Sequence, residues 1–463
     1  MREATEFVAQ TANLIQFDTE DSGGVSRFLR SLFRHFNSSG IRYCVLHSWE
    51  DLPQHLQTDL DMVVHPEDGP RLFGVLRSLR ADGFSAIQCF NYYTNAYYFV
   101  FCWFAELDFK TAAVDVILDH RRSGLVFSNG AEMTAGRRQH NEFWIPACET
   151  EFRYLLVKKA WKGGASAFQS DRLRNLVEQL GPEKATAIAA EIFGNRWKKR
   201  AIEACATGSV EKLLGQSRSK FWWTAISCQP LQLIGFLVNE AVRAIRRIFE
   251  PTGLLVAAVG PDGAGKSTVI TGLMECFQRS FRLERVFHWR PQIFASQKHK
   301  DFGTDPHGKS QRGALLSMAS LSACFLDYWI GYVFVIRPLL SKSCLVIFDR
   351  YFHDVLVDPK RYRYGGPKWF AQFLAHLVPE PDLVMFLDSD PESVAQRKAE
   401  LPVAEIRRQN HEYRELRFSR GRKAVVRTDA GIKSTLFAST RTVAEFIEQR
   451  LARRMRNWKR IAA

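Results

Sequence analysis

The sequence predicts an α/β protein whose C-terminal half contains a parallel sheet flanked by helices. In that half, short apolar runs of strand length alternate with longer segments whose apolar residues recur at helical spacing. A glycine-rich turn joins the first run, 254–259, to a helical pattern at 269–277. The chain has 463 residues, too many for one ordinary core, so at least one further domain is expected upstream.

Changes in pattern along the chain divide it into three predicted parts. Residues 1–150 mix strands and helices and predict an α+β domain. Residues 151–250 are almost entirely helical in pattern and predict a connector. Pro251 to Gly253 break the chain before the next apolar run, so the C-terminal domain is expected at 251–463.

The composition indicates the cellular compartment and the charge of the binding partners. A hydrophobic content of 46% with 24% charged residues is typical of soluble globular proteins. The net charge of +15 favours anionic partners such as nucleotides or a membrane face, whereas no aromatic-basic reader motif supports nucleic acid. The nine cysteines include no C-x-x-C pair, and the N-terminus lacks the pattern of a signal peptide, so we expect a cytoplasmic protein.

Three aspartates in the first domain suggest a metal site. Asp59 and Asp61 fall on one face of a predicted strand at 58–64, since side chains alternate along a strand, and Asp115 falls on another predicted strand at 113–118. Carboxylates grouped in this way can hold divalent ions. The alternative is that they are surface aspartates at strand ends. The other elements expected here are a helix within 1–40, strands at 41–46, 85–93, 97–104 and 143–146, and a helix at 67–79.

The helical connector ends in a segment of mixed character. The predicted helix at 231–249 has a basic face with Arg243, Arg246 and Arg247. A basic amphipathic helix can lie on a membrane surface, while a solvated face on a connecting helix is the commoner interpretation.

The turn after the run 254–259 has the sequence GPDGAGKST at 260–268, which fits G-x-x-x-x-G-K-[ST] at every fixed position. Glycines allow successive backbone N–H groups to surround a phosphate, and the helix N-terminus adds partial positive charge. Lys266 can reach the outer phosphates and the Ser267 hydroxyl can ligate Mg²⁺. The predicted ATP-binding residues are Gly260, Asp262, Gly263, Ala264, Gly265, Lys266, Ser267 and Thr268.

The rest of the C-terminal half continues the alternation. The run 344–348 delivers Asp349 and Arg350 at its carboxyl end, where a P-loop protein places a carboxylate on the metal side. The apolar segment 321–340 is interrupted by Asp327 and Arg337, so we interpret it as a buried helix rather than a membrane span. The remaining expectations are strands at 285–291, 381–388 and 425–430, a loop at 292–313, and helices from 391 and at 442–455.

These residues together resemble the thymidylate kinase family over about 250–460. The motifs that carry this resemblance are GPDGAGKST, DRY at 349–351, PDLVMFLD at 381–388 followed by Pro391 and Glu392, and the basic stretch 397–408. The resemblance implies that Asp262 lies near the acceptor sugar, that Arg350 holds the acceptor phosphate, and that Asp349 lies on the Mg²⁺ and acceptor side. It also implies that Arg397 belongs to a closing lid and that Arg290 matches a phosphate-binding arginine.

The N-terminal domain resembles the nucleotidyltransferase fold over about 35–160. The residues that carry this resemblance are His47-Ser48, then Asp59 and Asp61, then Asp115. The resemblance implies that the three carboxylates bind metal for nucleotidyl transfer. The sequence departs from the family at His47, which stands where the family turn usually has glycine, so a non-catalytic form of the fold is an alternative.

The predicted function is ATP- and Mg²⁺-dependent phosphoryl transfer to a small-molecule acceptor, foremost a nucleoside monophosphate such as dTMP. The segment after residue 351 lacks recognisable thymine-reading residues and offers His353, Asp354, Asp358 and Arg361 instead. Nucleosides and sugar or lipid phosphates are therefore alternative acceptors. The other hypotheses are a bifunctional protein whose N-terminal half is an active nucleotidyltransferase, and a protein that uses ATP binding as a regulatory switch. Whether the chain forms a homodimer is left open.

Overall fold

The structure is a computed structural model of the whole chain. It describes residues 22–93, 95–122, 125–162, 167–207, 230–293, 310–397 and 401–458. The first part of the helix expected within 1–40 and most of the loop expected at 292–313 lie outside these residues. The chain divides into two compact units, one centred on Ile245–Arg450 and the other on Ala112–Ala244 with most of the preceding chain. Each unit is described by itself.

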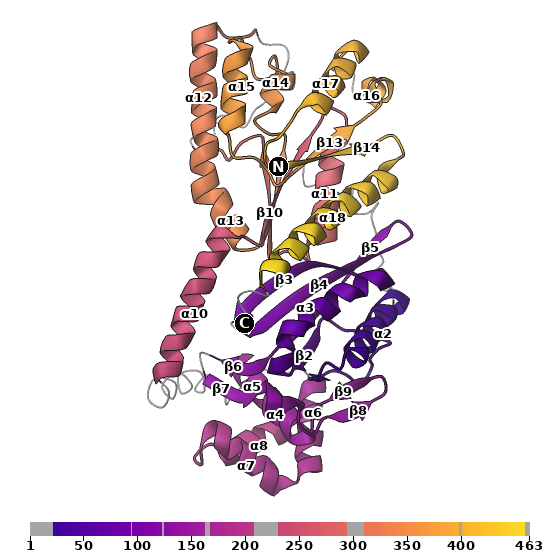
Figure 1. Cartoon of the computed structure of the whole chain (residues 1–463), viewed down its shortest axis with the longest axis vertical. Helices are drawn as coiled ribbons and strands as arrows, with labels where there is room; N and C mark the ends of the chain where they lie inside the picture. The colour runs from indigo at the N-terminus through magenta and orange to yellow at the C-terminus, as the bar shows by residue number, and fades with distance from the viewer. Residues whose placement is uncertain are drawn as a thin grey trace. The chain divides into compact units, whose positions relative to one another are not determined.

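The C-terminal unit contains the predicted parallel sheet (Figure 1). Its five strands lie in the order β11-β12-β10-β13-β14, and every neighbouring pair is parallel. The two strands β10 and β13 are buried along their whole length, as expected for parallel strands covered on both faces. The strands are β10 (Leu254–Val259), β11 (Leu283–His288), β12 (Cys344–Asp349), β13 (Leu383–Asp388) and β14 (Arg422–Arg427).

The register of these strands brings distant sequence together at one edge. Ala258 at the end of β10 pairs with Asp349 at the end of β12, and His288 at the end of β11 pairs with the same Asp349. The carboxyl ends of the strands in an open parallel sheet are where such folds bind ligands. The turn after β10 and the turn after β12 therefore lie side by side at this edge.

Helices connect and cover these strands. The helix α11 follows the glycine-rich turn, and a longer helical run leads from α12 through a π-helical turn, η5, into α13. The expected last strand lies at Arg422–Arg427 rather than 425–430, and the closing helix is much longer than expected. The helices are α11 (Lys266–Phe277), α12 (Ala314–Gly331), η5 (Tyr332–Ile336), α13 (Arg337–Ser341), α14 (Asp354–Val357), α15 (Lys368–Leu377), α16 (Pro391–Arg397), α17 (Val403–Glu415) and α18 (Ile432–Trp458).

The prediction that 321–340 is a buried helix is right for one face only. The run Ala314–Ser341 is long and apolar enough to cross a membrane, and a third of its most apolar window is buried in the protein. Asp327 on the buried face is fully enclosed and accepts hydrogen bonds from the backbone N–H groups of Gln292 and Ile293 at 3.0 and 2.8 Å. Sequence alone did not reveal the exposed face, because an apolar helix has the same pattern whether or not a partner covers it.

The N-terminal unit is built on a mixed sheet in the order β1-β2-β5-β4-β3. Strand β1 is antiparallel to β2, which is parallel to β5, and β3 is antiparallel to β4. The expected first helix is α2, and its Phe28, Phe33 and Phe36 are fully buried. The elements are α2 (Ser22–Ser38), β1 (Tyr43–Val45), β2 (Leu60–Val64), α3 (Gly69–Ser78), β3 (Ser85–Tyr93), β4 (Ala96–Ala105) and β5 (Asp108–Ile117).

Beyond β5 the chain forms two small hairpins, of which only β9, at the strand expected at 143–146, was predicted, and then the expected helices. The strands are too polar to stand out, because β6 reads DHRR and β8 reads RQH. These elements are β6 (Asp119–Arg122), β7 (Leu125–Asn129), α4 (Gly130–Thr134), β8 (Arg138–His140), β9 (Phe143–Ile145), α5 (Cys148–Lys162), α6 (Ala167–Leu180), α7 (Pro182–Phe193), α8 (Lys198–Thr207) and α10 (Pro230–Phe249).

Candidate active site

The turn between β10 and α11 has the backbone geometry of an anion cradle. Gly260, Gly263 and Gly265 all have positive φ angles, of 151°, 84° and 88°. A Cβ added to Gly260 would lie 2.9 Å from the carbonyl oxygen of Leu387, so a side chain does not fit there. The turn opens directly into the N-terminus of α11, and its fold is therefore fixed by glycine at the positions that a phosphate-binding loop requires.

The side chain of Lys266 lies inside this turn. Its Nζ atom donates hydrogen bonds to the backbone carbonyls of Gly260 and Pro261 at 2.9 and 2.7 Å, and the side chain is buried. Burial and the nearby Arg350 lower the pKa of Lys266 to about 8, although Asp262, 3.8 Å away, acts in the opposite direction. The ammonium group is therefore placed inside the cradle, where an anionic ligand would favour its charged form.

The carboxylate of Asp262 contacts two arginines. Arg350 and Arg361 each donate a hydrogen bond to its carboxylate, one to either oxygen. Arg350 is almost fully buried and also donates to Asp354 at 3.1 Å. Its φ angle of 70° is left-handed, and its backbone N–H bonds to the carbonyl of Ala258. The backbone after β12 thus turns the guanidinium towards the glycine-rich turn.

Asp349 stands at the carboxyl end of β12, facing the same edge. Its Oδ2 atom lies 3.2 Å from Nδ1 of His288, at the end of β11. Burial alone would raise the pKa of Asp349, but His288 and Lys266 outweigh it and hold the pKa below its ordinary value. The carboxylate is therefore anionic at neutral pH, as a metal-side ligand has to be.

The other basic residues implied by the resemblance lie apart from this group. Arg397 is exposed at the end of α16, and no described contact joins it to the glycine-rich turn. Arg407 pairs with Glu392 at 2.7 Å, and Arg408 pairs with Glu405 and Glu412. Arg290 lies beside Cys324 and Asp327 on α12.

Around Arg350 the protein buries several polar groups, of which sequence reasoning singled out only Asp354. Asp354 Oδ1 and the hydroxyls of Tyr362 and Tyr413 are buried without a hydrogen-bond partner among the described residues. Burial raises the pKa of both tyrosines and of Asp354. Tyr362 stacks on Trp289, with ring centroids 4.5 Å apart. Buried polar groups are normally satisfied, so these atoms are available to a hydroxylated or amide-bearing ligand.

The cradle fits ATP with Mg²⁺. Lys266 and the N–H groups of the turn would hold the outer phosphates. Ser267, exposed in the first turn of α11, and the carboxylate of Asp349 would offer oxygen ligands to the metal. Thr268 and Ala264 belong to the same turn, and Ala264 is buried beneath it.

Comparison with known proteins identifies this region. The family model described as "Thymidylate kinase" matches residues 260–428. The thymidylate kinase of Lactobacillus delbrueckii is 33% identical over 147 residues, which are 30% of this chain and 65% of that protein. A probable thymidylate kinase of Pyrobaculum aerophilum is 31% identical over 150 residues, covering 31% of this chain and 68% of that protein. Residues 260–428 form a thymidylate kinase domain. Through it, the chain belongs to the thymidylate kinase family.

Solved thymidylate kinases align at lower identity. That of Candida albicans is 20% identical, covers 43% of this chain and 92% of its own, and has a TM-score of 0.32. That of Ehrlichia chaffeensis is 18% identical, covers 42% and 98%, and has a TM-score of 0.29. The chain spans 65% of the Lactobacillus protein's length, and the family match identifies no residue before the thymidylate kinase domain.

In the N-terminal unit, the three predicted metal-binding aspartates are not equivalent. Asp61 and Asp115 are direct neighbours on the parallel strands β2 and β5. The strand β2 begins at Leu60, so Asp59 lies directly before the strand and not within it. Among the described residues, no group of three or more His, Cys, Asp or Glu side chains is arranged to hold a metal ion.

Basic groups already bind Asp61. Lys158 on α5 contacts its Oδ1 at 2.7 Å, and His47 contacts its Oδ2 at 2.9 Å. Burial would raise the pKa of Asp61, but Lys158 and His47 outweigh it and lower the pKa. The sequence did not indicate Lys158, because on an amphipathic helix a lysine normally faces solvent. A lysine ammonium thus occupies one side of the carboxylate that a metal would need.

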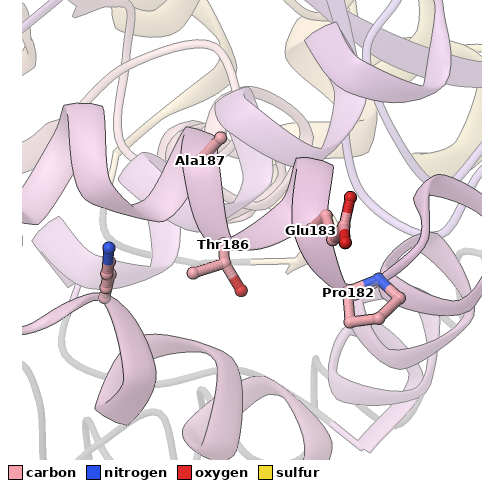
Figure 2. A pocket seen from close by; sticks show the side chains of 5 residues that line it. Pro182, Glu183, Thr186 and Ala187 are labelled. Atoms are coloured by element: carbon pink, nitrogen blue, oxygen red, sulfur yellow. The ribbon is translucent and has the colours of Figure 1, made fainter.

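A surface hollow lies on the helical part of the N-terminal unit. Its volume is about 470 Å³, and it opens between α7 and α8 (Figure 2). Pro182, Glu183, Thr186 and Ala187 line it, together with Lys198. One acid and one base on a surface hollow do not form a catalytic group.

Proposed function

We propose that the thymidylate kinase domain transfers a phosphoryl group from ATP, with Mg²⁺, to a nucleoside monophosphate such as dTMP. The observation that supports this most is the convergence of Lys266, Arg350 and Arg361 on Asp262 at the carboxyl edge of the sheet. Phosphoryl transfer depends on positioning and on cations that stabilise developing charge, and this edge provides both.

Each residue of the group has a distinct role in this proposal. Lys266 binds the transferred phosphate, while Arg350 and Arg361 hold the phosphate of the acceptor. Asp262 fixes the two guanidinium groups before the acceptor arrives, which lowers the ordering cost of binding. Asp349 and Ser267 would hold Mg²⁺, which would neutralise charge on the phosphates of ATP. Arg397 would supply a further cation as part of the closing lid that the family resemblance implies.

The test is turnover of ATP with a panel of acceptors, comparing the wild-type protein with Lys266→Ala. The matched control is Lys342→Ala, which removes an exposed lysine of the same domain. The proposal predicts that dTMP or another nucleoside monophosphate is phosphorylated, that the Lys266 variant loses turnover, and that the control retains it. Full activity of the Lys266 variant would show that the turn is not the ATP site. Turnover with sugar or lipid phosphates alone would overturn the nucleotide acceptor while leaving the kinase assignment intact.

We propose nucleotidyl transfer by the N-terminal unit as a second candidate function. The observation that favours it is the neighbouring pair Asp61 and Asp115 on parallel strands. The experiment is transfer of an α-phosphate label from nucleoside triphosphates with Mg²⁺ or Mn²⁺. Loss of the label in an Asp61→Asn, Asp115→Asn protein would support this function, and absence of transfer by the wild-type protein would refute it.

A further inference from the structure

Helix α5 lies inside the N-terminal unit and directs two polar side chains, one turn apart, towards strand β2. Phe152, Leu155 and Val157 of this helix are buried, so the protein encloses the helix on several sides. Lys158 and Tyr154 are buried with them, at 6% and 3% exposure. Residues four apart lie on the same face of a helix, so both side chains reach the same neighbour. The ammonium group of Lys158 is therefore held in the interior of the unit.

The neighbour of both side chains is Asp61, and each oxygen of its carboxylate is in contact with a protein group. Oδ1 lies 2.7 Å from Nζ of Lys158 and 3.5 Å from the hydroxyl of Tyr154. Oδ2 lies 2.9 Å from Nε2 of His47. Ser48 contacts the other side of the same imidazole, with Oγ 2.9 Å from Nδ1. The oxygens that Asp61 would offer to a metal ion are thus bound by the chain itself.

The Lys158 ammonium supplies positive charge beside two carboxylates. Asp61 pairs in register with Asp115 on β5, so the two acidic residues lie next to each other on parallel strands. Burial alone would lower the pKa of Lys158, but Tyr154 and Asp61 outweigh it and hold the pKa above its ordinary value. A buried ammonium and a buried carboxylate are tolerated as a pair, and separating them is costly.

This arrangement does not fit a divalent metal ion. Such an ion takes oxygen ligands, so it would have to displace the Lys158 ammonium from Oδ1 of Asp61. The ammonium would then be buried beside a cation instead of its carboxylate partner, which is unfavourable on both counts. Within the described residues, moreover, no three His, Cys, Asp or Glu side chains come together as a metal site.

We infer that Lys158 is a built-in cation that keeps divalent metal ions off Asp61 and Asp115 in the free protein. The two carboxylates that suggest a metal site in the sequence are closed to metal by a side chain from a distant helix. The inference goes beyond the proposed nucleotidyl transfer, because it concerns metal binding without nucleotide and is measured separately.

The experiment is Mn²⁺ binding to the full-length protein without nucleotide, followed by the electron paramagnetic resonance signal of free Mn²⁺. Lys158→Gln keeps a hydrogen-bond donor beside Asp61 but removes the charge. We expect the wild-type protein to show no binding that depends on Asp61. Lys158→Gln should gain one site, at least about tenfold tighter than any such site of the wild-type protein, and adding Asp61→Asn should abolish it. Circular dichroism shows whether each variant is folded.

A second measurement uses Lys158→Met, which leaves the buried carboxylate without any partner from α5. Mn²⁺ should raise the urea midpoint of this variant, because a ligand that binds the folded state stabilises it, and should leave the wild-type midpoint unchanged. The matched control is Lys184→Gln, since Lys184 is an exposed lysine of the same unit and its loss should create no site.

The result for the wild-type protein can overturn the inference by itself. Mn²⁺ binding that Asp61→Asn removes would show that the ammonium does not exclude metal, whatever the Lys158 variants do. A folded Lys158→Gln protein without a new site would overturn the inference as well. Mn²⁺ held by the thymidylate kinase domain is common to all these proteins and cancels in the comparison. Transfer of the α-phosphate label is a separate assay, so the nucleotidyl transfer proposal fails or stands on its own result.

Discussion

Arg361 donates a hydrogen bond to Asp262 across 99 residues of sequence, joining the segment after β12 to the glycine-rich turn after β10. Arg350 contacts the other oxygen of the same carboxylate, so two guanidinium groups share one counter-ion. Arg350 also contacts Asp354 at 3.1 Å, so carboxylates fix both guanidinium groups at the edge of the sheet. In the proposed function, the acceptor phosphate binds to these two guanidinium groups.

Replacing Arg361 by Ala should therefore weaken acceptor use more than ATP binding. Hydrogen bonds to charged groups contribute about 1.5 to 3 kcal/mol, so kcat/KM for the acceptor should fall about ten- to a hundredfold. The Kd for ATP should change by less than about twofold, since Lys266 and the glycine-rich turn remain intact. Steady-state kinetics with varied acceptor, together with calorimetric ATP binding, measure the two effects.

The matched control for this prediction is Lys360→Ala. Lys360 is the neighbouring cation but is exposed, so its removal tests general loss of charge. Equal losses in the two variants would mean that Arg361 acts through the overall field and not through contact with the acceptor phosphate.

ATP binding should take up a proton at mildly alkaline pH. The pKa of Lys266 is lowered to about 8 by burial and Arg350, so much of this group is neutral above pH 8 in the free protein. Phosphates favour the charged form and raise the pKa, so at pH 8.5 to 9 binding should bring roughly half a proton or more. Calorimetry in two buffers with different ionisation enthalpies measures this number directly.

Lys266→Arg is the matched control, because a guanidinium remains charged throughout this range. Its binding should involve no proton uptake, whatever its affinity for ATP. If the wild-type protein and this variant gave the same proton count at pH 9, Lys266 would already be charged in the free protein, and the prediction would be wrong.

The C-terminal sheet could be predicted from sequence because its signals are local. The three central strands, β10, β12 and β13, are continuous apolar runs, and the turn at Gly260 combines its own glycines with a strand before and a helix after. Contacts between distant residues could not be predicted in this way. The pairs Arg361 with Asp262 and Lys158 with Asp61 join residues 99 and 97 positions apart, and nothing in the local pattern of either lysine or arginine marks it as buried.

Stability should fall as the pH drops from about 6.5 to 4, with His353 as one identifiable cause. Burial lowers the pKa of His353 to about 4 from 6.5, so in this window the unfolded chain binds a proton that the folded protein does not. The stability that this neutral histidine contributes is present above pH 6.5 and is lost progressively towards pH 4, by about 3 kcal/mol in total. His353→Gln should remove this part of the pH dependence.

Urea unfolding at pH 7 and at pH 4.5 measures this difference for the wild-type protein and the variant. His376→Gln is the matched control, because His376 is exposed on α15 and should leave the pH dependence unchanged. The prediction concerns the difference between the two pH values, so a general loss of packing in His353→Gln does not imitate it. An undiminished acid sensitivity in His353→Gln would contradict the buried, neutral state of this side chain.

Lys158→Met should strongly destabilise the N-terminal unit. The change leaves the Asp61 carboxylate buried beside Asp115 without its ammonium partner, and removing one member of a buried ion pair costs about 3 to 5 kcal/mol. Adding Asp61→Asn should restore a large part of that loss, because the uncompensated charge is then gone. Urea unfolding of the two single variants and the double variant gives the coupling energy.

The matched control is Lys184→Met, since Lys184 and Glu149 form an exposed pair 3.3 Å apart whose loss should cost less than about 1 kcal/mol. Equal stability of Lys158→Met and the wild-type protein would show that Asp61 is protonated or hydrated in solution, and would leave its carboxylate free for a metal.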